Sequence, residues 1–353
     1  MPSARAIRGL VVAGPSSGCG KTTIALGLMA ALRARGLPVY PFKIGPDFID
    51  PGHHQRIGGV VSRNLDGWML SKDYNRRCFL SHCETSGIAV VEGVMGLFDG
   101  YDGKTESGST AQMAKWLALP VLLVVDARSM ARSAAALVFG FERFDPQVSF
   151  LGVVFNRIGS PRHLQYLSEA LAGAVDMPIL GGIPRSAPVS IPERHLGLVM
   201  SEELDDDDRF VPELKALVET NLDVDRLIEL LPVRNSEAPA AEPAAGGVQK
   251  PVRIAVARDA AFCFYYQDNF DRLVENGAEL VWFSALEDDR LPEDIHGIYF
   301  GGGYPELHAV RLAANQGLKN QVLASSRAGM PIYGECGGLM DLVSRVRTVR
   351  YRW

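Results

Sequence analysis

Residues suited to phosphate chemistry lie in a glycine-rich loop near the start of the chain. The segment GPSSGCGKTT at 14–23 follows an apolar run and precedes a stretch rich in Ala, Leu and Met. Glycines let backbone N–H groups turn toward phosphate oxygens, and the N-terminus of a following helix adds partial positive charge. The lysine neutralises the β- and γ-phosphates, and the first threonine offers its hydroxyl to Mg²⁺. We therefore predict an ATP and Mg²⁺ site that includes Gly18, Gly20, Lys21, Thr22 and Thr23.

A second group of candidate residues is acidic and follows two other apolar runs. Glu92 ends the run 88–92, while Lys43 and Asp47 belong to the segment KIGPDFIDPGHH at 43–54. The carboxyl ends of parallel strands meet at one edge of a sheet, so both segments can face the phosphates. Glu92 is then expected to hold Mg²⁺. Asp47 could complete the metal coordination or orient a substrate carboxylate, and Lys43 could screen negative charge. Taken singly, each acid could also be a solvated loop residue or a helix cap.

A third group of residues surrounds Cys336 near the end of the chain. The segments GGGYPE at 301–306 and YGECGGL at 333–339 each follow a predicted strand. Small residues around Cys336 are typical of a nucleophile elbow, and the N–H groups of Gly303 and Gly337 could form an oxyanion hole. These motifs resemble a class I glutamine amidotransferase, in which a cysteine attacks the side-chain amide of glutamine and releases ammonia. A buried structural cysteine is the alternative.

The base that should activate this thiol is not evident in the sequence. A thiol nucleophile needs a base, usually a histidine, and the resemblance puts that histidine well after the elbow. All seven histidines precede Cys336, with His296 and His308 in the same domain, and an arginine-rich tail follows at 341–353. We therefore expect an incomplete, C-terminally truncated glutaminase domain. Amidation would then depend on ammonium salts and be insensitive to Cys336→Ala.

Strands alternating with helical stretches must position these residues. Apolar runs predict strands at 9–13, 39–44, 88–92, 121–126 and 150–156 in the first part of the chain. This alternation favours βαβ units and a parallel sheet. We predict an α/β protein with a phosphate-loop domain at 1–200, a connector helix and flexible linker at 201–249, and a flavodoxin-like second domain at 250–353.

Composition excludes several classes of partner. The net charge of -5 gives no basic footprint for nucleic acid, and no apolar run is long enough to span a bilayer. The N-terminus lacks a signal-peptide pattern, so we expect a cytoplasmic protein. Five scattered cysteines, and a His53–His54 pair without a third ligand at metal spacing, do not predict a zinc site. A homodimer is left open.

Three motifs together resemble the cobyrinate a,c-diamide synthase family. They are the loop at 14–23, the segment 43–53, and VEGVMGLFDG at 91–100. The usual first glycine of a phosphate loop would fall at Pro15, whereas this chain has Gly14, and that longer form resembles the loop of dethiobiotin synthetase. The resemblance implies a dethiobiotin-synthetase-like first domain. It also implies amidation of the a- and c-acetate carboxylates of a corrin or related tetrapyrrole, through an acyl phosphate, with ATP and glutamine.

The same resemblance assigns roles to individual residues. It implies metal or activation chemistry at Asp47 and Glu92, and contacts with the macrocycle carboxylates near Phe48, Ile49 and Asp99. Asn156, at the end of the run VVFNR, resembles the adenine-reading element of the superfamily, where an amide pairs as donor and acceptor with the base edge.

Other readings of the same motifs stay open. A cobyric acid synthase and a dethiobiotin synthetase fit less well, because the first is longer and the second lacks the glutaminase. A nickel-sirohydrochlorin a,c-diamide synthase cannot be separated from a corrin enzyme by these residues. A truncated, non-catalytic nucleotide-binding protein, with partition ATPases as its model, is the remaining alternative.

Overall fold

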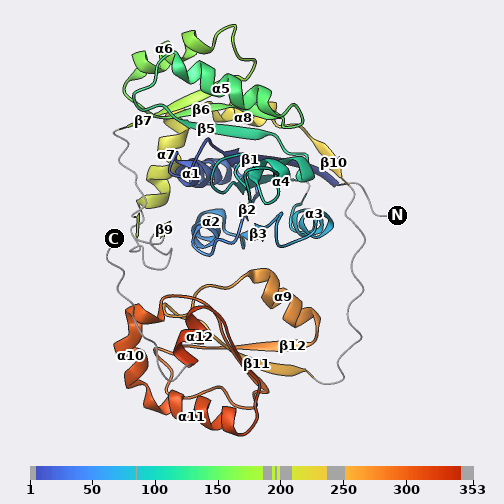
Figure 1. Ribbon diagram of the computed structural model, residues 1–353, viewed down its shortest axis with the longest axis vertical. Helices are drawn as coiled ribbons and strands as arrows, with labels where there is room; N and C mark the ends of the chain where they lie inside the picture. Colours follow the sequence, from blue (N-terminus) through green and yellow to red (C-terminus); the bar gives the residue numbers. More distant parts are fainter. Residues whose placement is uncertain are drawn as a thin grey trace. The chain divides into compact units, whose positions relative to one another are not determined.

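The chain folds as two compact units, Met1–Ala241 and Glu242–Trp353 (Figure 1). The computed structural model describes residues 5–84, 86–185, 193–194, 197–198, 209–236 and 251–342. Residues 201–208 and 237–249 of the predicted connector and flexible linker, and 343–353 of the arginine-rich tail, lie outside the described residues.

The first unit is built on a mainly parallel sheet, which confirms the predicted fold class. Its path runs β3-β2-β4-β1-β5-β6-β7, and β10 pairs with β1 in antiparallel orientation. The strands are β1 (Arg5–Ala13), β2 (Val39–Ile44), β3 (Arg63–Leu65), β4 (Ile88–Glu92), β5 (Val121–Asp126), β6 (Phe150–Ile158), β7 (Ile179–Pro184) and β10 (Arg234–Ser236). The short strands β8 (Glu193–Arg194) and β9 (Gly197–Leu198) form a separate pair.

Helices cover both faces of this sheet. They are α1 (Lys21–Ala34), α2 (Asp50–Gly58), α3 (Lys72–Ser81), α4 (Thr110–Leu117), α5 (Ser133–Phe144), α6 (Pro161–Leu171), α7 (Phe210–Asn221) and α8 (Val224–Leu230). Side chains alternate along a strand, so Leu10 and Val12 of β1 join the core beside α1, while Val11 and Ala13 join the core beside α3 and α4. Strands buried on both faces explain the continuous apolar runs in the sequence.

Helices α7 and α8 belong to the core of the first unit. Their buried leucines and valines join the cluster that contains α1. The approach of α7 to α1 is close, because a Cβ built at Gly27 would lie 2.3 Å from Cγ2 of Val218. The segment that the sequence predicts as a connector helix therefore contributes to the apolar core that supports the phosphate loop.

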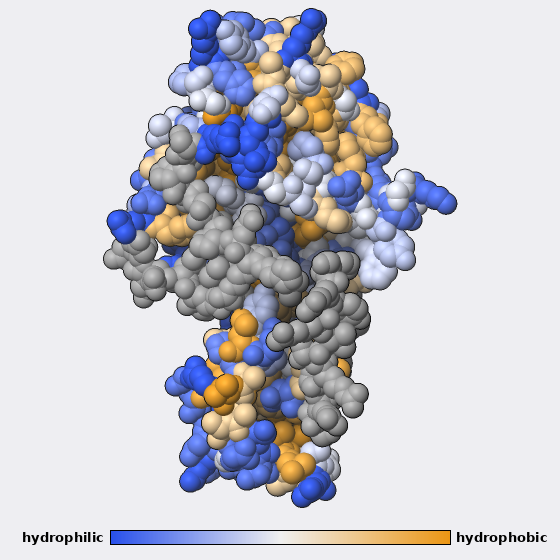
Figure 2. Space-filling model, turned by 60° about the vertical axis from the view of Figure 1, so that its left-hand side comes forward, coloured by the Kyte–Doolittle hydropathy of each residue, from blue (hydrophilic) through white to orange (hydrophobic). Residues whose placement is uncertain are grey.

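The second unit has a smaller parallel sheet in the order β12-β11-β13-β14. Its strands are β11 (Val252–Ala257), β12 (Ala278–Phe283), β13 (Gly297–Phe300) and β14 (Ile332–Gly334). Its helices are α9 (Gln267–Glu275), the 3₁₀ turn η1 (Pro305–His308), α10 (Ala309–Ala314), α11 (Gln316–Arg327) and α12 (Gly337–Leu342). Hydrophilic and hydrophobic side chains are interspersed on the visible surface of both units (Figure 2). In the described part of the chain, no helix is long and apolar enough to cross a membrane.

Candidate functional site

The loop between β1 and α1 has the backbone of a phosphate cradle. Gly18 and Gly20 take positive φ angles of 73° and 104°, which side chains disfavour. A Cβ at Gly20 would lie 2.0 Å from Nδ2 of Asn156, whereas one at Gly18 would meet no atom within 4 Å. No side chain caps the first turn of α1, a helix described in full, so its N–H groups can receive an anion. These residues fit a bound phosphate chain.

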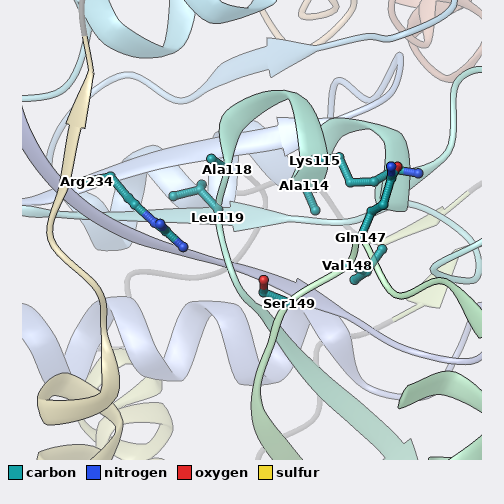
Figure 3. A pocket seen from close by; sticks show the side chains of 8 residues that line it. All are labelled: Ala114, Lys115, Ala118, Leu119, Gln147, Val148, Ser149 and Arg234. Atoms are coloured by element: carbon teal, nitrogen blue, oxygen red, sulfur yellow. The ribbon is translucent and has the colours of Figure 1, made fainter. Parts of the chain in front are cut away.

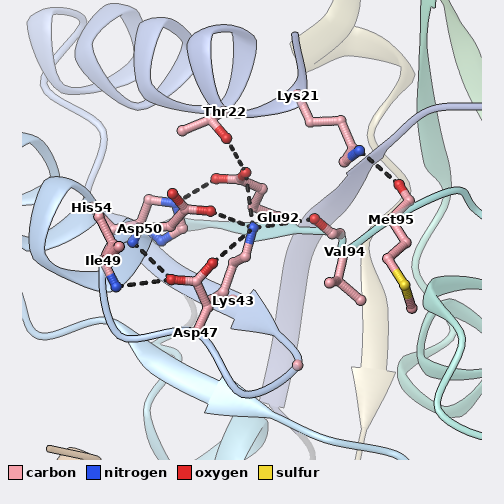
Figure 4. A network of polar contacts seen from close by, with 12 residues as sticks. Lys21, Thr22, Lys43, Asp47, Ile49, Asp50, His54, Glu92, Val94 and Met95 are labelled. Carbon is pink, nitrogen blue, oxygen red and sulfur yellow. Dashed lines mark hydrogen bonds and ion pairs between the residues drawn. The ribbon is translucent and has the colours of Figure 1, made fainter. Parts of the chain in front are cut away.

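Lys21 is held over this loop by backbone carbonyls. Its Nζ donates to the oxygens of Ser16 at 2.9 Å and Met95 at 2.6 Å (Figure 4). Burial lowers the pKa of the Lys21 ammonium, although the nearby acids oppose this effect. Because carbonyl oxygens are neutral acceptors, a phosphate would offer this cation a stronger partner.

Beneath the loop, polar side chains converge on Glu92 at the end of β4 (Figure 4). The Glu92 side chain is fully buried. Its Oε1 accepts from the Thr22 hydroxyl at 2.5 Å and from Lys43 Nζ at 3.0 Å. Lys43 Nζ also lies 2.5 Å from Oδ2 of Asp50 and 3.9 Å from Oδ2 of Asp47. The structure thus brings together Thr22, Lys43, Asp47 and Glu92, four residues that the sequence singles out.

The pKa values of the two buried acids of this cluster shift in opposite directions. Burial alone would raise the pKa of Glu92, but the Lys43 charge and hydrogen bonds from His54 and Thr22 hold it well below its usual range. The pKa of Asp50 is raised, first by burial and then by the Glu92 charge, against the attraction of Lys43. Despite burial, Glu92 and the neighbouring aspartates raise the pKa of Lys43 above its ordinary value. These shifts favour the charged forms of both Glu92 and Lys43.

His54 is a member of this cluster that the sequence analysis did not assign. Its ring is fully buried, with Nε2 2.7 Å from Oε2 of Glu92 and Nδ1 3.0 Å from Oγ of Ser62. The spacing of Asp50 and His54 in α2 could have revealed it, because residues i and i+4 share one face of a helix. His53 is also fully buried. Within the described residues, no three His, Cys, Asp or Glu side chains are grouped as a metal site.

The two carboxylate oxygens of Asp47 make different contacts. Its Oδ1 accepts from the backbone N–H groups of Ile49 and Asp50, at 2.8 and 3.0 Å, at the start of α2. Asn64 of β3 holds the same loop by donating to the backbone oxygens of Gly45 and Asp47. Oδ2 of Asp47 stays on the Lys43 side of the cluster. The cap and the predicted role in coordination therefore use different oxygens.

The predicted substrate-contact residues lie in two loops at the same sheet edge. Phe48 is half-buried and Ile49 is buried at the start of α2. Asp99 is exposed after β4, and its Oδ2 accepts from the N–H of Gly96 at 2.9 Å. This hydrogen bond makes Asp99 part of a turn.

Asn156 and its neighbour Arg157 tie β6 to the phosphate loop. Asn156 Nδ2 donates to the oxygen of Cys19 at 2.9 Å, and Oδ1 accepts from the N–H of Arg157. Arg157 Nη1 donates to the oxygen of Gly18 at 2.7 Å and to Oδ2 of Asp126 at 2.6 Å. Asn156 therefore supports the loop directly, and its predicted contact with adenine would use its remaining donor and acceptor capacity.

In the second unit, Cys336 occupies a strained turn between β14 and α12. Its φ is +50°, which is uncommon for a side-chain-bearing residue and typical of a nucleophile elbow. The thiol-bearing residue is exposed. A Cβ at Gly337 would lie 3.1 Å from N of Gly303, and one at Gly302 would lie 3.4 Å from Sγ of Cys336. The two predicted oxyanion-hole residues are thus adjacent beside the thiol.

The two histidines of this unit occupy different places relative to Cys336. His296 directly precedes β13, and its Nδ1 accepts from the N–H of Arg253 at 3.1 Å. Because β13 and β14 are parallel, His296 lies at the sheet edge opposite Cys336. His308 ends η1, whose Pro305 would be 2.8 Å from a Cβ at Gly337.

A pocket of about 360 Å³ lies elsewhere in the first unit (Figure 3). It is lined by Ala114, Lys115, Ala118, Leu119, Gln147, Val148, Ser149 and Arg234. Segments 118–119 and 147–149 immediately precede β5 and β6, so this pocket lies at the amino edge of the sheet. The phosphate loop and the Glu92 cluster lie at the carboxyl edge, so the chemistry described above is not in this pocket.

Comparisons with known proteins agree with this two-part geometry. Residues 10–199 match the CobQ/CobB/MinD/ParA nucleotide binding domain, and residues 253–351 match the CobB/CobQ-like glutamine amidotransferase domain. A cobyrinate a,c-diamide synthase of Listeria innocua is 45% identical over 338 residues, covering 95% of this chain and 74% of that protein. The enzyme of that name from Syntrophotalea carbinolica is 47% identical over 333 residues, covering 94% and 72%. A chloroplast FtsY structure from Physcomitrella patens covers 59% of this chain and 65% of its own, at 16% identity and a TM-score of 0.34, too low to bear on the fold. The chain therefore belongs to the cobyrinate a,c-diamide synthase family, and it combines a nucleotide-binding domain with a glutamine amidotransferase domain.

Proposed function

We propose that this chain converts the a- and c-acetate carboxylates of cobyrinate, or of a related tetrapyrrole, to amides with ATP and ammonia released from glutamine. A carboxylate is a poor electrophile, so its oxygen must first accept the γ-phosphoryl group of ATP. Ammonia then attacks the acyl carbon, the bond to the phosphate oxygen breaks, and phosphate leaves. Positioning and charge neutralisation supply most of the catalysis in such phosphoryl transfers.

The residues of the first unit divide this work. Lys21 and the N–H groups around Gly18 and Gly20 would bind the ATP phosphates. Thr22 and Glu92, in contact at 2.5 Å, would hold Mg²⁺, which supplies charge neutralisation at the phosphates when bound. Lys43 would meet the negative charge of the substrate carboxylate. The buried contact of Thr22, Glu92 and Lys43 beneath the loop is the observation that best supports the proposal.

The second unit would release the ammonia. The Cys336 thiolate would attack the side-chain amide carbon of glutamine. The carbon–nitrogen bond would then break as the nitrogen takes up a proton from solvent, so that ammonia leaves and a thioester forms. Water would then hydrolyse the thioester to glutamate. The adjacent N–H groups of Gly303 and Gly337 would stabilise the oxyanion of both steps. The positive φ of Cys336 supports this role because it exposes the thiol at the end of β14.

The test is an amidation assay with Lys21→Ala as the diagnostic variant. Purified protein is mixed with ATP, Mg²⁺, ammonium or glutamine, and either cobyrinate or nickel-sirohydrochlorin, and mass spectrometry counts the amides formed. Wild type should form a diamide from one macrocycle, and Lys21→Ala should form none because the phosphates lose their lysine. Unchanged ATP turnover in that variant would show that the loop at 14–23 is not the ATP site. Failure of the wild type with both macrocycles would favour a non-catalytic nucleotide-binding protein.

A further inference from the structure

Trp68 and Tyr101 form an exposed aromatic pair in the first unit. Their ring centroids lie 5.1 Å apart with an interplanar angle of 18°, which is a stacked arrangement. Trp68 follows β3 and Tyr101 follows β4, so both rings belong to loops at the carboxyl edge of the sheet. They are 58% and 69% exposed, so most of their apolar surface stays in contact with water.

The backbone holds these two loops in place. The N–H of Trp68 donates to Oδ1 of Asp66 at 2.8 Å, and the N–H of Tyr101 donates to the oxygen of Ser107 at 2.8 Å. Gly108 has a φ of +77°, and a Cβ there would lie 3.2 Å from Cβ of Trp68 and 3.8 Å from N of Tyr101. Both loops therefore meet at Gly108, and backbone contacts hold the two residues that bear the rings.

Folding of the first unit does not account for this pair. Neither Trp68 nor Tyr101 is part of a described apolar core cluster. Because both rings stay largely exposed, they contribute little hydrophobic stabilisation to the fold. A fixed aromatic surface of this kind suits a flat conjugated ligand, because stacking requires a rigid ring face. The same sheet edge carries the buried Lys43 ammonium, which lies 3.0 Å from Glu92 and 2.5 Å from Asp50, and which a substrate carboxylate would approach as a further negative partner. A conjugated ring with carboxylate arms matches both features.

We propose that the Trp68–Tyr101 pair supports one face of the tetrapyrrole macrocycle while a carboxylate arm reaches the Lys43 cluster. The proposal rests on the amidation function above. The register of the sheet supports it, because Lys43 pairs with Asn64 in neighbouring strands. The chain therefore leaves β3, on its way to Trp68, next to the loop that carries Asp47. These rings bind the part of the substrate that does not react, and so act as positioning residues.

The test compares Trp68→Ala and Tyr101→Ala with Trp68→Phe and with Phe139→Ala. Phe139 is 47% exposed on α5 and serves as a control for loss of a surface ring. Cobyrinate is titrated into each protein and followed by its own absorbance, and ammonium-dependent amidation is measured in parallel. Stacking on one aromatic side chain is worth roughly 5- to 150-fold in affinity. Each alanine variant should therefore raise Kd and KM for cobyrinate about ten- to hundredfold, with kcat at saturation unchanged.

Controls separate this proposal from a structural role and from the function on which it rests. Nucleotide affinity and melting temperature should match wild type in all variants, and Trp68→Phe should keep most of the cobyrinate affinity. Normal cobyrinate affinity in both alanine variants would overturn the proposal while leaving the amidation function intact. An equal loss of nucleotide and cobyrinate affinity would also overturn it. If wild type neither binds nor amidates cobyrinate or nickel-sirohydrochlorin, the proposed function fails first.

Discussion

Removing the charge of Lys43 should destabilise the first unit, because this ammonium is buried among carboxylates. Lys43→Met keeps the length of the side chain but deletes the ammonium that lies 3.0 Å from Oε1 of Glu92. Glu92 is 0% exposed, so water cannot replace the lost cation. Deleting one partner of a buried ion pair costs about 3–5 kcal/mol because the other charge stays buried. For a unit of this size, that range corresponds to a fall in Tm of roughly 6 to 20 °C.

The pH dependence of this loss has a definite sign. In wild type, Lys43 and the hydrogen bonds keep the pKa of Glu92 below its unfolded value in spite of burial, so its stabilisation is present above about pH 4.3 and is lost in acid. In Lys43→Met, burial should raise the pKa of Glu92 above that value. The variant then loses stability as the pH rises above about 4.3. The difference in Tm from wild type should therefore grow between pH 4 and pH 7.

Scanning calorimetry of the full chain, in EDTA and without nucleotide, measures this difference. Lys215→Met is the matched control, because Lys215 is 42% exposed and lies 3.9 Å from Glu219; its effect should stay within about 0.5 kcal/mol. The double variant Lys43→Met/Glu92→Gln should recover part of the lost stability, since no unpaired charge is then buried. A Lys43→Met transition that coincides with wild type at pH 7, or a difference that does not change with pH, would refute the buried ion pair.

Three further predictions concern nucleotide binding and the two reactions. Glu92→Gln and Asp47→Asn should each lower kcat for ammonium-dependent amidation by about 10²-fold, which is the contribution of one preorganised charged group, while changing ATP affinity far less. Near-normal rates for both variants at saturating Mg²⁺ would show that neither acid takes part in catalysis. Cys336→Ala should abolish glutamate release from glutamine and leave ammonium-dependent amidation intact; residual glutamate release would place the nucleophile elsewhere. Gly20→Ala should lower both stability and nucleotide affinity, because its Cβ would lie 2.0 Å from Asn156. Gly18→Ala should lower stability only by the strain of a positive φ. Equal losses of nucleotide affinity for the two variants in calorimetric titrations would contradict the loop geometry.

Five strands of the first sheet were predictable because each apolar run ends at a polar or glycine residue, whereas β3, β7 and β10 were not predicted. The predicted bounds 39–44, 88–92 and 121–126 match β2, β4 and β5, and β1 and β6 extend beyond their predicted ends. The single connector helix expected within 201–249 is instead two helices, α7 and α8. Leu222 is extended and bridges β7 at Gly181, and Asp223 then caps α8 through the N–H of Arg226. This break depends on a tertiary contact with β7, which no local pattern contains.

The chemistry of the acidic cluster shows where sequence reasoning stops. Their positions at strand ends were enough to single out Glu92 and the Lys43 segment. Position alone does not distinguish the environments of Asp47, Asp50 and Glu92. The distances separate them, since Glu92 accepts from Thr22, Lys43 and His54, whereas Asp50 has Lys43 at 2.5 Å and also meets the charge of Glu92. The surroundings therefore shift the pKa of Glu92 toward the charged form and that of Asp50 away from it, and Glu92 is also the acid in contact with the Thr22 hydroxyl. A cation beneath the phosphates would meet that carboxylate first, which is why Glu92 rather than Asp50 is the residue whose neutralisation should slow amidation most.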